Sequence, residues 1–146
     1  IRKGAKKVYS VDVGYGQLDW NLRNNPRVEV LEKTNARYLD SDIIRNELDA
    51  IVCDVSFISL KKVIKPNIKF LKNNGWIISL IKPQFEIGKT LLGKGGVVKN
   101  TEHHQMVVDD ITAFFENEID LSIKGIIDSP ILGPKGNKEF LIYGKK

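Results

Sequence analysis

The sequence predicts an α/β domain in which a parallel sheet is covered by helices, and three observations support this prediction. Short runs rich in β-branched residues alternate with segments of helical spacing, as they do in strand–helix–strand units. Two of these runs, 49–55 and 76–81, are apolar almost throughout, which is typical of buried strands. The length of 146 residues is sufficient for one hydrophobic core and too short for two.

The first third of the chain contains two predicted strands and two predicted helices. Residues 7–13 form a strand-like run. Residues 18–24 are predicted to be a short helix, because Pro26 prevents its continuation. Residues 27–31 alternate between polar and apolar side chains and are predicted to be the second strand. A further helix is predicted at 41–47.

The middle of the chain is predicted to contain two buried strands on either side of a helix. Residues 49–55 form the first strand, and 76–81 form the second, which ends at a Lys-Pro pair. Between them, residues 60–71 have the spacing of an amphipathic helix. Pro66 predicts a kink or a late start in this helix, and the Asn-Asn-Gly at 73–75 is expected to terminate it.

The last third is predicted to contain a glycine-rich loop, a helix and two strands. The loop covers 86–99 and is expected to be mobile above a site. Thr101 is expected to cap a helix that runs to about Glu118. The final strands are predicted at 121–127 and 139–143, and they are expected to pair in an antiparallel way. The buried face of the helix is expected to carry Met106, Val107, Ile111 and Phe114.

The composition is that of a soluble globular protein, with 42% hydrophobic and 28% charged residues. The formal net charge of +5 favours an anionic partner such as nucleic acid. No stretch approaches the roughly 20 apolar residues that cross a bilayer, and the amino-terminal residues have no signal-peptide pattern. Cys53 is the only cysteine, which excludes a disulfide within the chain and a cysteine-built metal site. We therefore expect a cytoplasmic protein without a membrane or metal partner.

Lys82 has the sequence context of a functional lysine. It follows a predicted buried strand and precedes Pro83, which pushes it into an extended conformation at the carboxyl end of that strand. Ligands of open α/β sheets bind at this edge. A lysine that loses solvent there can act as a base, because desolvation disfavours its charged form. The alternative is a lysine that ends the strand and points into water.

Two aspartates also lie at strand ends. Asp12 precedes a pair of glycines, and an acid at this place either accepts hydrogen bonds from ribose hydroxyls or forms an Asp-Gly turn. Asp54 is flanked by apolar residues and is costly to bury unless it is paired. If 49–55 and 76–81 are neighbouring strands, Asp54 lies close enough to Lys82 to pair with it. The alternative is that Asp54 or Ser56 caps the helix that follows.

The remaining polar residues give weaker signals. Glu139 opens the last predicted strand after a Gly-Asn-Lys turn, and on pattern alone it is an ordinary turn-to-strand acid. His103 and His104 are adjacent near a helix start, so they cannot face the same side and are expected at the surface. No metal-ligand spacing involves either histidine.

Five ordered motifs resemble the TlyA (hemolysin A) group of FtsJ-like methyltransferases, which methylate the ribose 2′-hydroxyl of ribosomal RNA. Together these motifs extend from the first residues of the chain to the last few. They are Val11–Leu18, Glu32–Arg37, Asp54–Leu60, Ile81–Glu86, and Ser129–Ile131 with Gly136–Leu141.

The resemblance implies a Rossmann-like S-adenosylmethionine-dependent methyltransferase fold, with a mostly parallel sheet and helices on both faces. By position in the motifs, the catalytic residues correspond to Asp54, Lys82 and Glu139. Lys82 is then the base that takes the proton of the ribose hydroxyl. Ribosomal RNA in a ribosomal subunit is the implied partner.

The resemblance also implies the cofactor S-adenosyl-L-methionine and the residues that bind it. Asp12 corresponds to the acid that binds the cofactor ribose, and Val13 lies beside it. Asn35 falls where the adenine end of the cofactor is contacted. Asp54 is the fourth residue that we assign to cofactor binding.

Members of this family carry further segments before the first motif. These are a small RNA-binding domain, a segment with the first catalytic lysine, a central strand and a glycine-rich cofactor loop. Gly14-Tyr15-Gly16 is too short to be that loop. We therefore expect residues 1–146 to be an amino-terminally incomplete methyltransferase domain that is inactive on its own.

Three other functions remain open at this point. A non-catalytic RNA-binding or ribosome-assembly module would need the positive charge but no buried lysine. A membrane-lytic protein, which the hemolysin label suggests, would need a hydrophobic span or a strongly amphipathic basic helix. A different small-molecule enzyme on a nucleotide-binding fold would also fit the strand ends. The sequence predicts no oligomeric state.

Overall fold

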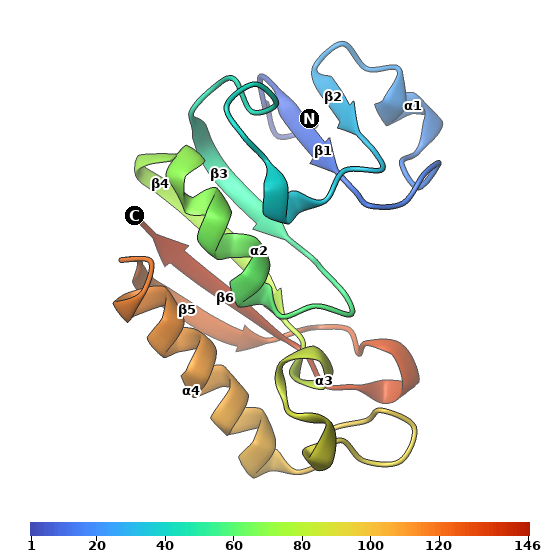
Figure 1. Cartoon of the computed structure of the whole chain (residues 1–146), viewed down its shortest axis with the longest axis vertical. Coiled ribbons are helices and arrows are strands. Elements are labelled where there is room, and N and C mark those ends of the chain that lie inside the picture. Colours follow the sequence, from blue (N-terminus) through green and yellow to red (C-terminus); the bar gives the residue numbers. More distant parts are fainter. The chain divides into compact units, whose positions relative to one another are not determined.

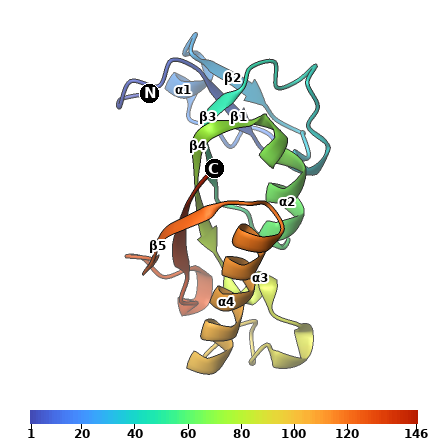
Figure 2. The same ribbon diagram turned by 90° about the vertical axis from the view of Figure 1, so that its left-hand side faces the viewer.

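The computed structural model describes residues 1–146 and divides them into two compact units, Ile1–Asn46 and Glu47–Lys146. Each unit contains its own sheet (Figures 1 and 2). The two units are described in turn.

The first unit is a parallel two-stranded sheet with a short helix. Strand β1 (Val8–Val11) pairs with β2 (Val28–Leu31), and helix α1 (Trp20–Arg23) lies between them in the sequence. The side chain of Asp19 accepts a hydrogen bond from the Asn21 amide and caps α1. These three elements confirm the predictions for this part of the chain. A 3-10 turn, η1 (Ala36–Tyr38), follows β2.

The predicted helix at 41–47 is wrong. The Asp40 side chain accepts hydrogen bonds from the amides of Asp42 and Ile43, each at 3.0 Å, and its carbonyl accepts one from Ile44 at 2.8 Å. An aspartate that bonds to the backbone two and three residues ahead favours a turn over a helix. Ile44 is 4% exposed. Its apolar side chain is therefore buried from a turn and not from the face of a helix.

The second unit is a mixed four-stranded sheet in the order β3-β4-β6-β5. Strand β3 pairs with β4 in parallel, and β6 runs antiparallel to both β4 and β5. The antiparallel pairing predicted for the last two strands is confirmed. The strands are β3 (Leu48–Cys53), β4 (Leu71–Ile81), β5 (Ser122–Asp128) and β6 (Phe140–Lys145).

Two helices cover one face of this sheet. Helices α2 (Leu60–Asn67) and α4 (Thr101–Asn117) lie on the same side of the sheet in Figure 2. They pack on strand residues that are fully buried, such as Ile77 and Ile142. The shorter elements are α3 (Pro83–Glu86) and the 3-10 turns η2 (Ile68–Phe70), η3 (Lys89–Leu91) and η4 (Pro134–Gly136).

The other face of this sheet is open, so the expectation of helices on both faces is not met in this unit. Val52, Ile78 and Tyr143 are successive register partners and therefore project from the same face. They are 74%, 37% and 38% exposed, whereas Cys53, Ser79 and Ile142 alternate with them and face the helices. The largely apolar strand runs that suggested burial on both faces are buried here on only one.

The largest differences from the predicted bounds are in α2 and β4, and the cap of α4 also differs. Helix α2 includes Pro66 and ends at Asn67, and β4 begins at Leu71 rather than at Trp76. The cap of α4 is Asn100, whose side chain accepts a hydrogen bond from the Glu102 amide, and not Thr101. Met106 is 47% exposed and does not lie on the buried face of α4.

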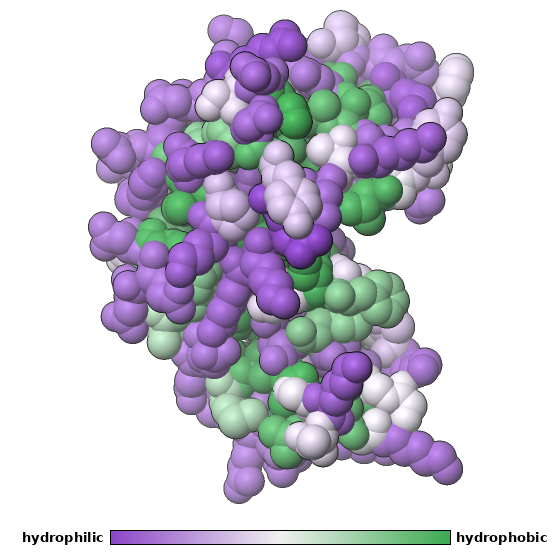
Figure 3. All heavy atoms as spheres, viewed as in Figure 1, coloured by the Kyte–Doolittle hydropathy of each residue, from purple (hydrophilic) through white to green (hydrophobic).

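The surface seen in Figure 3 is largely hydrophilic, with hydrophobic side chains scattered between the polar ones. No helix of the chain combines the length and the apolar character that crossing a membrane requires.

Candidate functional site

Lys82 and Asp54 form an ion pair at the carboxyl ends of two neighbouring parallel strands. Register partners Cys53 and Ser79 bring the ends of β3 and β4 side by side. Lys82 is extended, with φ −114° and ψ 95°, as expected for a residue before proline. Its Nζ lies 2.6 Å from Asp54 Oδ1.

The environment of this pair is asymmetric. The Lys82 side chain is 11% exposed and that of Asp54 is 66% exposed. The Lys82 ammonium also donates to Ser56 Oγ at 3.1 Å. The alternative of a lysine that points into water is therefore wrong, and the predicted pairing with Asp54 is present.

Helix α2 is capped by a distant glutamate. Glu86 Oε1 accepts a hydrogen bond from the Leu60 amide at 2.6 Å, whereas the N-cap residue Ser59 makes no side-chain cap bond. Neither Asp54 nor Ser56 serves as the cap, so that alternative is also wrong. Because Glu86 lies 26 residues beyond Leu60 in the sequence, no local pattern indicates the contact.

Phe57 is an exposed aromatic residue in a strained conformation. It lies in the loop after β3, is 90% exposed and has φ 63°, a region that bulky residues rarely adopt. Its ring packs against Phe85 with the ring centroids 5.0 Å apart. Strain of this kind persists only where the surrounding structure holds it, and it is common at functional sites.

Glu139 is a buried carboxylate directly before β6. It is 5% exposed, and its Oε1 accepts a hydrogen bond from Gln84 Nε2 at 2.8 Å. Gln84 lies in α3, two residues after Lys82, and is itself 8% exposed. The sequence pattern for an ordinary turn-to-strand acid does not reveal this burial.

The glycine-rich segment 86–99 is fastened to the turn before Glu139. Asn137 Oδ1 accepts from the Val98 amide, and Asn137 Nδ2 donates to the Gly96 carbonyl. The Lys135 ammonium donates to the Gly95 carbonyl at 2.9 Å. These bonds hold the carboxyl-terminal half of the predicted loop close to the strand that carries Glu139.

His104 also bonds to this segment. Its Nε2 lies 2.9 Å from the Val98 carbonyl oxygen, and the residue is 8% exposed. The expectation of a surface position for His104 is therefore wrong. The chain contains no cluster of three or more His, Cys, Asp or Glu side chains that could hold a metal ion.

Cys53 lies beside the Lys82–Asp54 pair. Burial raises the pKa of its thiol to about 12, the nearby Asp54 carboxylate adds to this rise, and Lys82 opposes it. Only the thiolate is a good nucleophile.

We expect Cys53 to react slowly with thiol reagents in the native protein. A rise in the thiol pKa from 9.0 to about 12 lowers the thiolate fraction at neutral to mildly alkaline pH by about 10³-fold. Stopped-flow labelling of native and denatured protein with a chromogenic disulfide measures the difference. Equal rates in the two states would contradict this account of the Cys53 environment.

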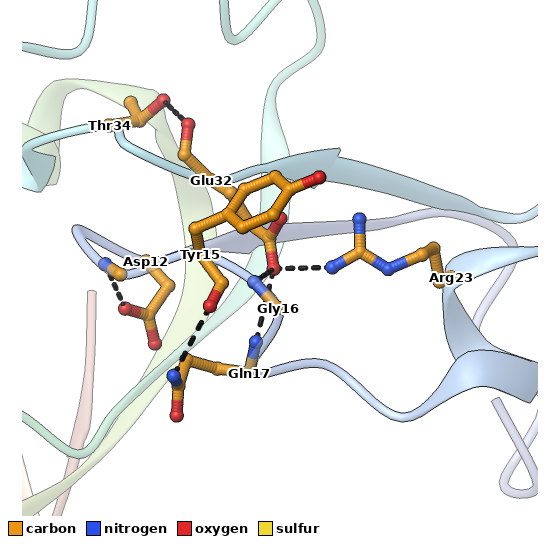
Figure 4. A network of polar contacts seen from close by, with 8 residues as sticks. Asp12, Tyr15, Gly16, Gln17, Arg23, Glu32 and Thr34 are labelled. Carbon is orange, nitrogen blue, oxygen red and sulfur yellow. Dashed lines mark hydrogen bonds and ion pairs between the residues drawn. The ribbon is translucent and has the colours of Figure 1, made fainter.

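In the first unit, Asp12 forms an Asp-Gly turn. Its Oδ1 accepts a hydrogen bond from the Gly14 amide at 2.6 Å (Figure 4). The Asp12 carbonyl accepts from the Thr34 amide, which ties the turn to the end of β2. The turn interpretation of Asp12 is thus confirmed, and its second carboxylate oxygen makes no hydrogen bond within the protein. Val13 is 71% exposed at the tip of this turn.

Glu32, the first residue of the second motif, organises the rest of the turn, a role that the sequence did not indicate. Its Oε1 accepts from the Gly16 amide at 2.8 Å and from the Gln17 amide at 3.2 Å, and it pairs with Arg23 (Figure 4). The hydrogen bond from Arg23 holds the pKa of the Glu32 carboxyl below its usual range. The glutamate therefore stays charged and fixes the segment that follows Asp12.

A small hollow of about 100 Å³ lies beside this network. It is smaller than the site of a drug-sized ligand, so it can accommodate only one edge of such a molecule. Asn35 lies further along the same segment, where its Oδ1 accepts from the Arg37 amide and caps η1. The hollow is lined by Ser10, Asp12, Gln17, Leu18 and Glu32.

The structure brings some of the predicted site residues together and leaves others apart. Lys82 and Asp54 are in contact, and Gln84 links Glu139 to the helical turn that follows Lys82. Asp12, with Val13 and Asn35, belongs to the first unit, and the other predicted residues belong to the second.

Comparison with known proteins identifies close relatives. The chain is 43% identical over 143 residues to the 16S/23S rRNA (cytidine-2′-O)-methyltransferase TlyA of Mycobacterium tuberculosis. The matched region covers 98% of this chain and 53% of the relative. The solved structure of a candidate hemolysin from Streptococcus thermophilus is 40% identical, with a TM-score of 0.93 over 99% of this chain and 52% of that one. The chain spans about half the length of the curated relatives it matches.

A more distant structure shows the same fold. The N-methyltransferase NodS of Bradyrhizobium japonicum, solved with S-adenosyl-L-homocysteine, matches with a TM-score of 0.61 at 12% identity, over 97% of this chain and 67% of that one. The predicted fold class, a Rossmann-like methyltransferase fold, is therefore confirmed. The FtsJ-like methyltransferase model matches residues 1–146. This chain therefore belongs to the FtsJ-like methyltransferase family.

Proposed function

We propose that this chain forms the methyl-transferring part of an S-adenosylmethionine-dependent enzyme that methylates ribose 2′-hydroxyls of ribosomal RNA. The observation that carries the proposal is the ion pair between the nearly buried Lys82 and Asp54 at the carboxyl edge of the sheet. Ligands of open α/β sheets bind at this edge. The Mycobacterium tuberculosis relative is a 16S/23S rRNA (cytidine-2′-O)-methyltransferase, which supports the choice of ribosomal RNA as substrate.

Lys82 acts as the base in this proposal. A ribose hydroxyl is scarcely ionised at neutral pH, so its proton must be removed as the new oxygen–carbon bond forms. Lys82 in its amine form accepts that proton at Nζ and becomes an ammonium. Asp54 orients Lys82 through the 2.6 Å contact and stabilises the ammonium that results.

Glu139 holds the reacting hydroxyl in place. Its carboxylate has one oxygen bonded to Gln84, and a carboxylate has further acceptor sites for a hydroxyl. A fixed acceptor of this kind contributes by orienting the nucleophile for in-line attack.

The residues assigned to the cofactor have suitable chemistry. S-adenosylmethionine, when bound, supplies an electrophilic methyl group on a sulfonium. The unbonded Asp12 carboxylate oxygen can accept from a ribose hydroxyl, with Val13 packing beside it. Asn35 uses its amide oxygen as a cap, which leaves its nitrogen as a donor toward the adenine end. Asp54 is the fourth proposed contact.

Phe57 and the glycine-rich segment are proposed to contact the RNA. An exposed aromatic ring can stack on a nucleotide base, and Phe57 is 90% exposed and supported by Phe85. Its exposure excludes the ordinary core role that many phenylalanines have. Lys89, Lys94 and Lys99 are exposed on the glycine-rich segment and are available for phosphate contacts.

Methyl transfer from tritiated S-adenosylmethionine tests the proposal. The full-length gene product, incubated with each ribosomal subunit, is expected to place label in the RNA at a position that resists alkaline hydrolysis, since a 2′-O-methyl group blocks cleavage. Binding of ribosomal RNA without any label incorporation, while S-adenosylmethionine binds, would favour the non-catalytic RNA-binding module.

A further inference from the structure

Glu139 lies in a recess whose walls are two residues without an assigned role, Gln84 and Gly133. A carboxylate that is 5% exposed is costly to bury unless it is hydrogen bonded. The structure supplies one side-chain donor, Gln84 Nε2, at 2.8 Å. Because Gln84 is itself 8% exposed, packing restricts its side chain, and the direction of the Glu139 carboxylate is fixed with it.

Gly133 forms the opposite wall. A Cβ atom at this position would lie 2.1 Å from Glu139 Oε1 and 2.7 Å from Glu139 Cδ, far inside van der Waals contact. The backbone of Gly133 has φ −71°, which any residue adopts. A Cβ atom at this position would therefore push the Glu139 carboxylate aside, although the backbone conformation itself would accept any residue.

The turn that carries Gly133 is rigidly held. The Gly133 amide donates to the Asn137 carbonyl at 2.8 Å, and its carbonyl accepts from the Gly136 amide at 3.1 Å. Asn137 is 4% exposed and also bonds to the glycine-rich segment. The wall against Glu139 therefore cannot move away without breaking several hydrogen bonds.

Gln84 also connects this recess to the proposed base. Lys82, Pro83 and Gln84 are consecutive, and Pro83 restricts the backbone between them. A single short segment thus presents Lys82 to Asp54 and Gln84 to Glu139.

We propose that Gln84 and Gly133 are positioning residues, which fix the Glu139 carboxylate in the orientation that methyl transfer requires. This inference rests on the proposed function, in which Glu139 touches the reacting hydroxyl. A misplacement of a catalytic group by about 1 Å can cost about 10²-fold in rate. We expect losses of about this size when either wall of the recess is changed.

Three variants of the full-length protein test the inference through single-turnover methyl transfer at saturating RNA and cofactor. Gly133→Ala introduces the clash, and Gln84→Met removes the donor at similar side-chain length. Gly125→Ala is the matched control, because a Cβ there meets no atom within 4 Å. We expect about 10²-fold slower transfer in the first two, an unchanged rate in the control, and unchanged cofactor dissociation constants in all three.

Glu139→Ala separates failure of this inference from failure of the proposed function. If Glu139→Ala is inactive while Gly133→Ala and Gln84→Met transfer methyl groups as fast as Gly125→Ala, the positioning roles are wrong and the role of Glu139 stands. If Glu139→Ala is fully active, its assigned role in the proposed function is wrong, and the positioning roles fail with it. Should Gly133→Ala not fold, Gln84→Met alone decides between these outcomes.

Discussion

Replacement of Lys82 by alanine is expected to slow methyl transfer to ribosomal RNA by about 10²–10⁴-fold, the usual contribution of a general base. The affinity for S-adenosylmethionine should change little, since the assigned cofactor residues are retained. The fold should tolerate the change, because the Asp54 left behind is 66% exposed and remains hydrated. Single-turnover transfer of a tritiated methyl group measures the rate, and calorimetry measures the affinity.

Lys72→Ala is a matched control for this experiment. Lys72 lies near the other end of β4 and pairs with Asp49 at 2.7 Å, much as Lys82 pairs with Asp54. Lys72→Ala removes a strand lysine and an ion pair of similar length, but it leaves the carboxyl edge of the sheet unchanged. We expect Lys72→Ala to retain normal methyl transfer.

Lys82→Arg separates proton transfer from electrostatic stabilisation. Arginine keeps the positive charge and can still pair with Asp54, but it stays protonated at all accessible pH values and cannot accept a proton. The base assignment predicts that Lys82→Arg is as slow as Lys82→Ala. A substantial recovery of rate in the arginine variant would instead assign Lys82 an electrostatic role.

The carboxyl edge of the second unit could be predicted from the sequence because its determinants are local. A run of β-branched residues ended by a Lys-Pro pair defines the end of β4, and proline restricts the conformation of Lys82. The parallel pairing of consecutive strands then places Asp54 beside it. Residue type, strand end and chain order were sufficient for this contact.

The supporting contacts could not be predicted because they join residues that are far apart in the sequence. Gln84 and Glu139 are separated by 55 positions, and Glu86 caps a helix that begins 26 residues earlier. Glu32 looks like an ordinary polar residue after a strand, yet it holds the amides of Gly16 and Gln17. Tertiary packing decides such partners, and no local spacing or composition encodes them.

The open face of the second sheet illustrates a different limit. A strand that is apolar on both sides is predicted to be buried on both sides. Val52 is nevertheless 74% exposed, because α2 and α4 both pack on the opposite face of the sheet. Hydrophobic periodicity reports which side chains are apolar. The connections between strands decide which face the helices cover.

Replacement of Asp12 by alanine is expected to weaken binding of S-adenosylmethionine by about 10–100-fold. A hydrogen bond to a charged group contributes about 1.5–3 kcal/mol, and each 1.4 kcal/mol changes an equilibrium constant about tenfold. Calorimetric titration of the full-length protein measures the dissociation constant. Asp42→Ala is the control, because Asp42 lies in the same unit and its carboxylate takes no part in the side-chain hydrogen bonds of the turn that carries Asp12.

Asp12→Asn distinguishes a direct contact from loss of the turn. The amide oxygen of asparagine can still accept the Gly14 amide hydrogen, so the turn at Asp12 is retained while the charge is removed. If Asp12 binds the ribose hydroxyls through its second carboxylate oxygen, Asp12→Asn should lose nearly as much affinity as Asp12→Ala. If only the turn matters, Asp12→Asn should bind as tightly as the natural protein. An unchanged dissociation constant in both variants would reject the ribose role, and with it the assignment of this turn to the cofactor.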